Sequence, residues 1–375
     1  MTPETLLIAD IERLVRCESP SEDLEAVARS AEVVAAVGAA RMGAEPERIV
    51  INGRTHLRWR FGDRPRVLVL GHHDTVWPTG TLERLPYGIR DGVLRGPGCF
   101  DMKAGLAMAF HAVAALDDNA GVSVLVTGDE EPGSPTSREL IEDEARGCDA
   151  VLVLEAAGPG GALKTERKGV SRYEVRVTGR AAHAGLEPEK GVNAALESAH
   201  QILAVAALGG RGTTVTPTTA RAGTTVNTVP ESAVFSVDVR TWTQEEQDRV
   251  HGAMLALRPH LDGAEVEVRG GPNRPPLQAE ASKDLFELAC RLSAEPLAST
   301  AVGGASDGNL TAGIGIPTLD GLGAVGGGAH ADDEHLVVAE LPVRTRLLTD
   351  ILHCLLGRNQ GARSVRADQL PTTSD

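Results

Sequence analysis

Aromatic residues are scarce in this chain: Phe, Trp and Tyr together make up only 3% of its 375 residues. Stacking platforms for bases or sugars are therefore not expected to dominate its function. Basic residues are also in deficit, with 37 Lys and Arg against 52 Asp and Glu and a formal net charge of −15. A field of this sign repels nucleic-acid phosphates and anionic membranes, so we expect neither as a partner.

Cysteine pairs and long apolar runs are missing from the sequence as well. The five cysteines lie far apart and include no Cys-x-x-Cys pair, which favours a reducing compartment. The N-terminal residues have the spacing of an amphipathic helix rather than the basic start and apolar run of a signal peptide. No apolar stretch has the length that a membrane span requires. We therefore expect a soluble cytoplasmic protein.

Apolar runs that alternate with helical patterns indicate an α/β fold. Uninterrupted runs such as Val67–Leu70 and Val151–Leu154 are typical of strands buried on both faces, and the Ala-rich segment Leu106–Leu116 predicts a helix between them. This rhythm predicts a mostly parallel sheet covered by helices, in which functional sites gather at the carboxyl ends of strands. Near the N-terminus, Ser21 is the predicted N-cap of a helix that begins at Leu24.

The pattern changes over residues 169–274. Apolar and polar residues alternate there as in half-exposed strands, and the expected elements follow in the order β-α-β-β-α-β. This order predicts an inserted α+β, ferredoxin-like domain that ends at a break in Gly270–Pro276. Residues 1–168 and 275–358 then form a discontinuous first domain, and residues 359–375 a polar, frayed tail.

Five short segments each end a predicted strand or glycine loop with a side chain that can bind a metal. They read GHHDTV, GPGCFDMKAG, GDEEPGS, VLVLEA and GGGAHADDEH. Their candidate ligands are two imidazoles and three carboxylates: His72, Asp101, Glu131, Glu155 and His330. This donor set suits a pair of divalent ions that share one bridging carboxylate. Taken singly, the segments have simpler interpretations, such as a turn histidine, a helix N-cap at Asp101 or a solvated acidic loop.

Two of these segments also suggest supporting roles. His72 and Asp74 lie two residues apart and point the same way on extended backbone, so Asp74 can accept a hydrogen bond that fixes the imidazole. In GDEEPGS, successive acids repel one another unless a cation or hydrogen bonds compensate them. Because adjacent side chains cannot easily share one metal, we expect Glu131 to bind metal and Glu130 to act as general base toward water.

In this order and spacing, the segments resemble the M20 family of co-catalytic metallopeptidases. The closest similarity is to the carboxypeptidase G2 (glutamate carboxypeptidase) branch. It rests on HHDTVWPTGTLERLPY, GPGCFDMKAGLA, TGDEEPGSPTSRELIE, GRAAHAGLEPEKGVNAA, TVNTVPESAVFSVDVR, and GGASDGN followed by GAHADDEHL. The resemblance extends over nearly the whole chain except its C-terminal end. It implies a zinc-peptidase catalytic domain with an inserted lid and dimerisation domain.

The resemblance also implies two Zn²⁺ ions, with Co²⁺ or Mn²⁺ as alternatives. His72 and Glu155 would hold one ion, Glu131 and His330 the other, and Asp101 would bridge them.

By the same resemblance, Glu130 would be the general base and acid, and Asp74 would orient the first histidine. In the inserted domain, His183 matches the histidine that polarises the substrate carbonyl, often across a dimer interface. Asn227 and Arg240 match the positions that hold a substrate carboxylate. A homodimer through the lid domain is therefore expected.

These features predict a di-zinc hydrolase that cleaves an amide bond next to a free carboxylate. By the same resemblance, the expected form is a carboxypeptidase that releases a C-terminal, glutamate-like residue from a small N-acyl amino acid or peptide. An N-acyl-amino-acid deacylase on the same scaffold is the nearest alternative, and a non-catalytic metal-binding relative is an alternative of another class. A nucleotide-binding protein is disfavoured, because Gly321-x-Gly323-x-x-Gly326 matches a dinucleotide fingerprint but does not lead into an apolar helix.

Overall fold

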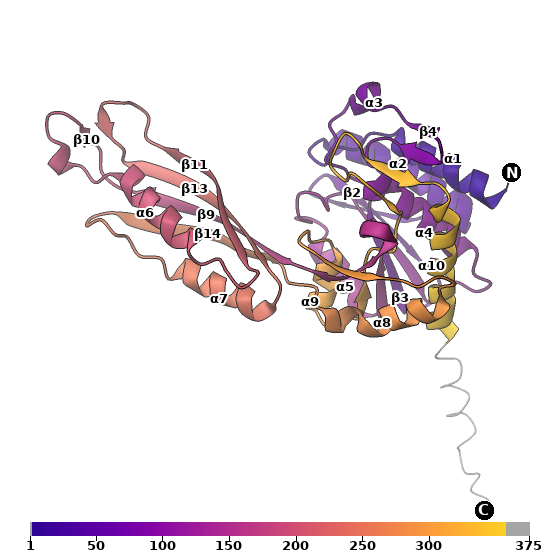
Figure 1. The fold of residues 1–375 in the computed structure, drawn as a ribbon. Coiled ribbons are helices and arrows are strands. Elements are labelled where there is room, and N and C mark those ends of the chain that lie inside the picture. The colour runs from indigo at the N-terminus through magenta and orange to yellow at the C-terminus, as the bar shows by residue number, and fades with distance from the viewer. Residues whose placement is uncertain (1, 358–375) are drawn as a thin grey trace, which may run out of the picture. The chain divides into compact units, whose positions relative to one another are not determined.

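The computed structural model describes residues 2–357 and forms two compact units (Figure 1). The second unit contains Glu166–Gln278 and Gly303–Ala305, and the first contains the other described residues. The predicted boundaries, 169 and 274, lie just inside those of the second unit. Its ends lie side by side, because the backbones of Arg167 and Leu277 exchange hydrogen bonds of 2.9 and 3.0 Å. The predicted tail, residues 359–375, lies outside the described residues.

A six-stranded mixed sheet forms the centre of the first unit, in the strand order β1-β2-β6-β3-β7-β16. The strands are β1 (Glu47–Ile51), β2 (Arg54–Arg60), β3 (Val67–His72), β6 (Val122–Thr127), β7 (Ala150–Val153) and β16 (Thr318–Leu319). The last four are parallel, whereas β1 and β2 form an antiparallel hairpin joined to β6. The predicted α/β class with a mostly parallel sheet is confirmed.

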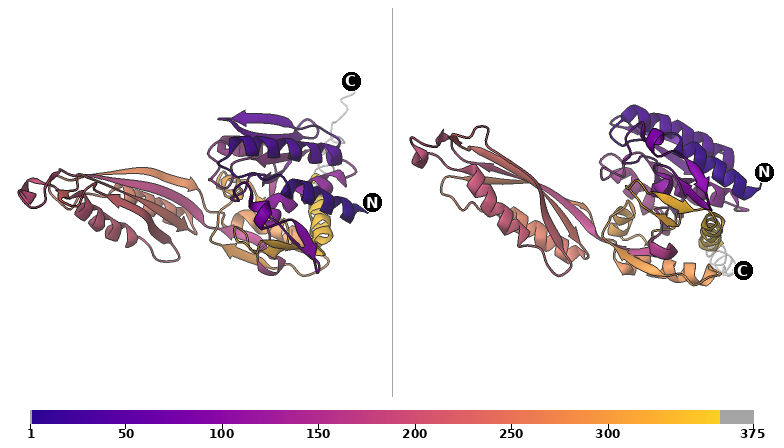
Figure 2. Two further views of the ribbon diagram at one scale, coloured as in Figure 1. Left: turned by 90° about the horizontal axis from the view of Figure 1, so that it is seen from above. Right: turned by 45° about the horizontal axis from the view of Figure 1, so that its top comes forward.

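Helices cover both faces of this sheet (Figure 2). On one face lie α1 (Pro3–Val15), α2 (Leu24–Met42), α4 (Ala104–Ala114), α8 (Ala279–Leu292) and α10 (Glu340–Gly357). On the other lie α5 (Arg138–Arg146) and α9 (Gly308–Gly313). Along β3 the side chains alternate between the two faces, as strand geometry requires: Val69 packs in the larger core and Leu70 in the smaller one.

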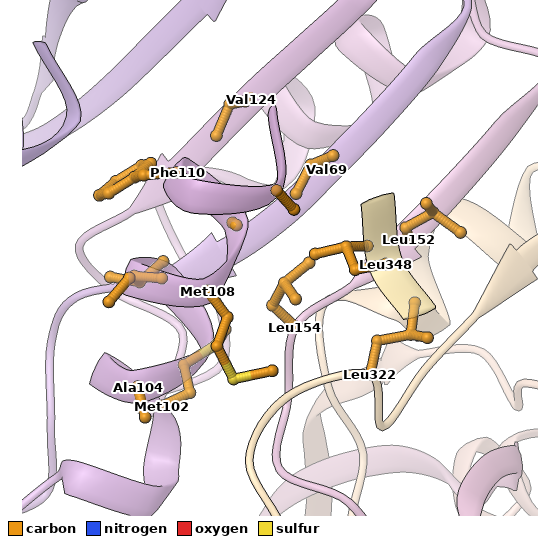
Figure 3. Close-up of a cluster of buried hydrophobic side chains, with 14 of the residues drawn as sticks. Val69, Met102, Ala104, Met108, Phe110, Val124, Leu152, Leu154, Leu322 and Leu348 are labelled. Atoms are coloured by element: carbon orange, nitrogen blue, oxygen red, sulfur yellow. The ribbon is translucent and has the colours of Figure 1, made fainter. Parts of the chain in front are cut away.

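The larger core forms where the parallel strands meet α4 and α10. Figure 3 shows Val69 and Leu152 of two neighbouring strands beside Met108 and Phe110 of α4 and Leu348 of α10. All five side chains are fully buried. This packing fixes the strands whose ends carry the candidate ligands.

Smaller elements complete the first unit. A four-stranded sheet has the order β17-β18-β5-β4. Its strands are β4 (Gly88–Arg90), β5 (Val93–Arg95), β17 (Gly326–Gly327) and β18 (His335–Val337). The remaining short elements are α3 (Thr81–Arg84), a π-helical turn at Cys99–Lys103, a 3₁₀ turn at Pro159–Gly161, and the paired strands β8 (Leu163–Arg167) and β15 (Ser299–Val302).

The second unit is an antiparallel sheet with helices on one face. Its four main strands, in the order β11-β13-β9-β14, are β9 (Gly169–Thr178), β11 (Thr214–Ala222), β13 (Ser232–Thr241) and β14 (Glu265–Arg274). The helices α6 (Ala194–Ala206) and α7 (Gln244–Leu255) pack on them, and the short strands β10 (Ala182–His183) and β12 (Thr228–Val229) form a separate pair, with a 3₁₀ turn at Pro188–Lys190. The main elements follow one another in the predicted β-α-β-β-α-β order.

Two local predictions are wrong. Ser21 does not cap α2, because the side chain of Asp23 accepts the hydrogen bond from Ala26 N–H, and Ser21 Oγ donates to Asp74 instead. The predicted break at Gly270–Pro276 begins too early, since β14 continues through Gly270 to Arg274 and ends only before Pro275 and Pro276. Gly270 sustains the strand there: its φ is 91°, and a Cβ on it would come within 2.2 Å of the Arg172 carbonyl oxygen.

Among the described residues, no helix is both long and apolar enough to cross a membrane.

Candidate metal centre

Three neighbouring parallel strands bring candidate side chains to one edge of the central sheet. His72 is the last residue of β3, Glu130 and Glu131 follow β6, and Glu155 follows β7. Because β3 pairs in parallel with both β6 and β7, the carboxyl ends of the three strands lie together. The position of these residues therefore follows from the sheet topology.

The other two candidate ligands come from the small sheet. β5 leads through a glycine turn into Asp101, and His330 lies in the loop between β17 and β18. Since β18 pairs with β5, both segments leave the same sheet. Asp101 is not the N-cap of α4, whose N-cap position is Lys103 without a side-chain cap. His330 has a φ of 63°, in the left-handed region that non-glycine residues seldom occupy.

The candidate ligands form two groups that share Asp101. His72 Nε2 lies 3.4 Å from Asp101 Oδ1 and 3.3 Å from Glu155 Oε1. His330 Nε2 lies 3.3 Å from Asp101 Oδ2 and 3.2 Å from Glu131 Oε2. Each oxygen of the shared carboxylate therefore faces a different histidine.

These separations suit metal ligands. Two donors bound to one tetrahedral zinc ion at about 2.0–2.1 Å lie roughly 3.3 Å apart. Among the described residues, the buried atoms His72 Nε2 and Glu131 Oε1 have no hydrogen-bond partner. Buried polar atoms in proteins are usually hydrogen-bonded, and these two atoms, one in each group, also lie beside other candidate ligands, so they fit a cation. The structure thus contains residues that could hold metal ions, with nitrogen and oxygen donors that suit zinc.

Glu130 lies close to the first group. One donor atom each from His72, Glu130 and Glu155 lies within 4.8 Å of the others, and the same holds for His72, Asp101 and Glu131. Glu130 is only 8% exposed, so it faces the site rather than bulk solvent. The structure therefore brings Glu130 to the same centre as the five candidate ligands.

The electrostatics reflect an excess of carboxylates around two imidazoles. Hydrogen bonds to Asp101 and Glu131 raise the pKa of His330 to about 10. Burial opposes a charge on His72, but its carboxylate partners still raise the pKa of His72 well above its usual value. Burial raises the pKa of Glu131, and pairing with His330 opposes the rise. For Asp101, the two histidines outweigh the effect of burial and hold its pKa far below the usual range. Such a site attracts cations.

Asp74 connects the β3 segment to the loop after β6. Its carboxylate accepts hydrogen bonds from Ser21 Oγ at 2.7 Å and from the backbone N–H groups of Glu130 at 3.1 Å and Glu131 at 3.3 Å. Burial alone would raise the pKa of Asp74, but its hydrogen-bond donors and above all the nearby His72 ring lower it to about 2. His72 Nδ1 lies 2.9 Å from the Asp74 backbone carbonyl and 3.5 Å from Oδ1, so the backbone is the nearer acceptor for the ring.

Two buried aspartates that the sequence analysis missed hold the loop carrying Glu130 and Glu131. Asp129 accepts hydrogen bonds from backbone and hydroxyl groups of Thr136 and Ser137. Asp307 accepts a hydrogen bond from Ser134 Oγ, across a long stretch of sequence. Asp307 stands in GGASDGN, which the resemblance included without a role for the residue, and no spacing rule in the sequence distinguishes Asp129 from the two acids after it.

The three remaining candidates lie in the second unit. His183 Nδ1 accepts hydrogen bonds from two backbone N–H groups, each at 3.1 Å, so the proton of the neutral ring is at Nε2. Asn227 lies beside it, since its carbonyl accepts from Ala184 N–H at 2.9 Å. Arg240, on β13, forms an ion pair with Asp238 of the same strand, through Nε at 2.8 Å and Nη2 at 3.0 Å.

An α/β unit that gathers histidines and carboxylates around one shared aspartate at the carboxyl edge of a parallel sheet has the architecture of a metallohydrolase. The sequence profile of Peptidase family M20/M25/M40 matches residues 68–353. Carboxypeptidase G2 of Pseudomonas sp. (strain RS-16) is 30% identical over 369 residues, covering 92% of this chain and 89% of that protein. The chain belongs to peptidase family M20/M25/M40 and is an enzyme of the hydrolase class.

Other relatives extend the comparison. A succinyl-diaminopimelate desuccinylase of Dechloromonas aromatica (strain RCB) is 29% identical over 346 residues, covering 84% of this chain and 90% of that protein. The structure of an M20 family metallo-carboxypeptidase from Sulfolobus solfataricus aligns with a TM-score of 0.71 at 16% identity, covering 93% of this chain and 99% of that one. The structure of Bacillus subtilis YxeP, described as a dinuclear metal-binding peptidase of the M20 family, aligns with a TM-score of 0.63 at 16% identity, covering 94% of this chain and 98% of that one. At these identities the two structures show a shared fold.

Proposed function

We propose that this enzyme is a di-zinc hydrolase that cleaves an amide bond next to a free carboxylate, as a carboxypeptidase that releases a C-terminal, glutamate-like residue. The observation that carries the proposal is the pair of donor groups around Asp101, with N···O separations of 3.2–3.4 Å. In this proposal His72 and Glu155 hold one ion, and Glu131 and His330 hold the other. The similarity to carboxypeptidase G2 supports the type of bond and the side of the substrate that is released.

The proposed chemistry divides between the metal centre and Glu130. Two bound zinc ions would lower the pKa of a shared water and polarise the scissile carbonyl. Glu130, next to His72 and Glu155, takes a proton from the attacking water as general base. It then returns this proton to the leaving amine as general acid. Asp74 positions this loop through the backbone N–H of Glu130.

Recognition of the substrate is assigned to the second unit. Arg240 already forms a two-bond fork with the carboxylate of Asp238, and this geometry suits a substrate carboxylate. Asn227 would add an amide donor to the same carboxylate. His183, with its proton at Nε2, can donate to the oxygen that becomes negative during attack. We propose that the second unit acts as a lid that brings these residues to the substrate.

A second candidate function is the removal of an acyl group from an N-acyl amino acid by the same chemistry. The similarity to succinyl-diaminopimelate desuccinylases favours this alternative. Both reactions hydrolyse an amide whose amine side carries a carboxylate, so they differ in the acyl group that the pocket accepts.

We further propose a cytoplasmic homodimer without nucleic-acid or membrane partners. The dimer contact is assigned to β11, which is an edge strand with mostly exposed residues. Leu196 and Leu203 of α6, which packs against β11, are 49% and 71% exposed. They lie seven residues apart and therefore on one face of the helix. An edge strand next to an exposed apolar helix face suits pairing with a second copy.

The test is a hydrolysis screen with zinc-loaded protein. Acetyl, peptidyl and folate-like acyl groups are joined to a series of amino acids, and each substrate is paired with its C-terminal carboxamide. We expect the free acids to be cleaved at least about 100-fold faster than the carboxamides, because a neutral carboxamide cannot accept the two charge-assisted hydrogen bonds that the guanidinium of Arg240 offers. Preference for peptidyl or folate-like acids supports the carboxypeptidase, and preference for small acyl groups supports the deacylase. Equal rates on acids and carboxamides would refute carboxylate recognition.

A further inference from the structure

A buried glutamate outside the proposed ligand set is bound to the backbone of the shared aspartate. Glu334 is 3% exposed, and its carboxylate accepts four hydrogen bonds. Oε2 accepts from Trp77 Nε1 at 2.7 Å and from Gly98 N–H at 2.9 Å. Oε1 accepts from Phe100 N–H at 2.9 Å and from Asp101 N–H at 3.0 Å. Both oxygens therefore have two donors each.

The backbone donors form a concave turn around the carboxylate. Gly98 has a φ of 71°, and a Cβ on it would come within 2.7 Å of Thr75 Cγ2, so the turn requires a glycine at this position. Successive N–H groups that converge in this way form an anion-binding nest. Here the anion is a side chain of the protein itself, contributed from more than 230 residues further along the sequence.

Glu334 also has a fixed relation to His330, which is on the same loop. Ala331 N–H donates to the Gly328 carbonyl at 2.9 Å, and Glu334 N–H donates to the Ala331 carbonyl at 2.9 Å. These two turns set the separation between the imidazole and the carboxylate. Trp77 directly follows GHHDTV, the segment that carries His72. One carboxylate therefore joins three of the five ligand-bearing segments.

We propose that Glu334 is a positioning residue of the metal centre, which sets where the two oxygens of Asp101 stand relative to His72 and His330. The inference rests on the proposed di-metal function. Its reason is geometric: Glu334 binds the peptide N–H of Asp101 itself, so a shift of this peptide moves the shared carboxylate away from both histidines. The separations of 3.4 and 3.3 Å between the Asp101 oxygens and the two histidines suit metal binding only while that peptide is held.

The test compares Glu334→Gln with the wild type in metal titrations. The neutral amide has the same size but turns an NH₂ group toward backbone donors. We expect the affinity for Zn²⁺, measured by competition with a chelator, to fall about 10–100-fold, as is typical when an outer partner of metal ligands is lost. We also expect the visible absorption spectrum of the Co²⁺-loaded protein to change in shape, because the coordination geometry changes.

A matched control separates positioning from general stability. Glu197 in the second unit is also fully buried and accepts backbone N–H bonds, from His260 at 2.9 Å and Leu261 at 2.7 Å. Glu197→Gln should lower the melting temperature as Glu334→Gln does but leave Zn²⁺ affinity and the Co²⁺ spectrum unchanged. Trp77→Phe removes one of the four donors to Glu334 and keeps an aromatic ring, so a smaller loss of affinity is expected.

The outcomes distinguish the two proposals. If Glu334→Gln has the same Zn²⁺ affinity and the same Co²⁺ spectrum as the wild type, the positioning role is overturned, whatever the melting temperature of the variant. If Glu334→Gln does not fold, Trp77→Phe decides, and unchanged affinity and spectrum in this variant would overturn the role as well. A wild-type protein that binds neither Zn²⁺ nor Co²⁺ would instead overturn the proposed function, and the positioning role with it.

Discussion

Glu130 and Glu131 are adjacent in the sequence but have different neighbours. Glu131 Oε2 lies 3.2 Å from His330 Nε2, whereas Glu130 groups with His72 and Glu155. Adjacent side chains diverge on a turn, so one carboxylate can bind an ion while the other handles protons. In the proposed mechanism Glu130 transfers protons and Glu131 binds metal. Replacing either carboxylate by the uncharged amide of glutamine tests this division.

Glu130→Gln should keep metal binding and lose hydrolysis. Removing a general base typically costs about 10²–10⁴-fold in rate, so kcat should fall by this amount at an unchanged metal content. The measurement is steady-state kinetics together with elemental analysis of the purified protein. Glu131→Gln serves as the comparison, because it should reduce the metal content itself. Full turnover in Glu130→Gln would contradict the mechanism.

His73, next to the candidate ligand His72, has a structural role of its own. It is completely buried, with Nε2 3.0 Å from the Thr55 carbonyl and Nδ1 3.2 Å from Ser30 Oγ. A neutral ring with its proton at Nε2 satisfies both contacts. Burial lowers the pKa of His73 from 6.5 to about 4. The folded protein therefore keeps this ring neutral at a pH where the unfolded chain protonates it.

This shift predicts a loss of stability in mild acid. Because the folded pKa is the lower one, the stabilising contribution is complete above pH 6.5 and is lost as the pH falls toward about 4. In this window His73 should add up to about 1.4 kcal/mol per pH unit to the slope of the unfolding free energy. Urea unfolding of metal-free wild type and His73→Gln at several pH values measures the difference. Equal slopes would show that His73 does not remain neutral.

At the scale of elements, the strand ends depend on close packing of α4 against β7. Gly105 lies near the start of α4, and a Cβ on it would come within 2.2 Å of the Leu154 carbonyl oxygen. Leu154 directly precedes Glu155, so the contact sits beside a candidate ligand. Only a residue without a side chain permits this approach.

Gly105→Ala should therefore destabilise the protein, by about 1–3 kcal/mol as for other overpacked sites. Gly252 in α7 is the matched control, since a Cβ there would meet no atom within 4 Å. Gly252→Ala should stabilise the protein by about 0.5–1 kcal/mol through helix propensity. Denaturant unfolding compares the two variants. A stabilising effect of both substitutions would mean that α4 is not held against the strand.

The sequence predicted those elements that a run of neighbouring residues identifies by itself. Apolar runs identified β3 and β7, and the end of a predicted strand or a glycine loop marked each candidate ligand. The β1–β2 hairpin was missed because Arg54, Arg58 and Arg60 interrupt the apolar pattern of its second strand. Gly270 was interpreted as a break, whereas its close contact with the neighbouring strand keeps it within β14. Such contacts depend on the strand partner, which a single sequence does not reveal.

The supporting residues of the site were missed for a related reason. Glu334 and Asp307 each bind a segment that lies far away in the sequence. Glu334 accepts a hydrogen bond from a backbone N–H, which nearly every residue has, and Asp307 accepts one from a serine hydroxyl, which is common, so neither partner stands out in the sequence. Glu334 also stands in the run Ala-Asp-Asp-Glu-His, where three acids are equivalent by composition. Only the fold shows which of the three turns inward.

At the scale of the whole molecule, the proposed dimer gives a distinct prediction. Leu203→Glu places a charge on the exposed face of α6 next to the β11 edge, and should convert the dimer to monomers at micromolar concentration. Leu255 is 54% exposed on α7, whose main contacts are with β9, β13 and β14, so Leu255→Glu is the control and should remain dimeric. Sedimentation analysis measures both masses. A monomeric wild type, or a dimer that Leu203→Glu does not affect, would contradict this interface.

The central claim concerns two metal ions that share Asp101 and are required for hydrolysis. The most direct test is to remove metal from the protein, add Zn²⁺ in steps, and follow bound metal per chain together with hydrolysis of an N-acyl glutamate. The account predicts no hydrolysis without metal, two bound ions per chain at saturation, and loss of both tight binding and hydrolysis in Asp101→Asn. Hydrolysis that survives metal removal, or saturation at a single ion per chain, would contradict it.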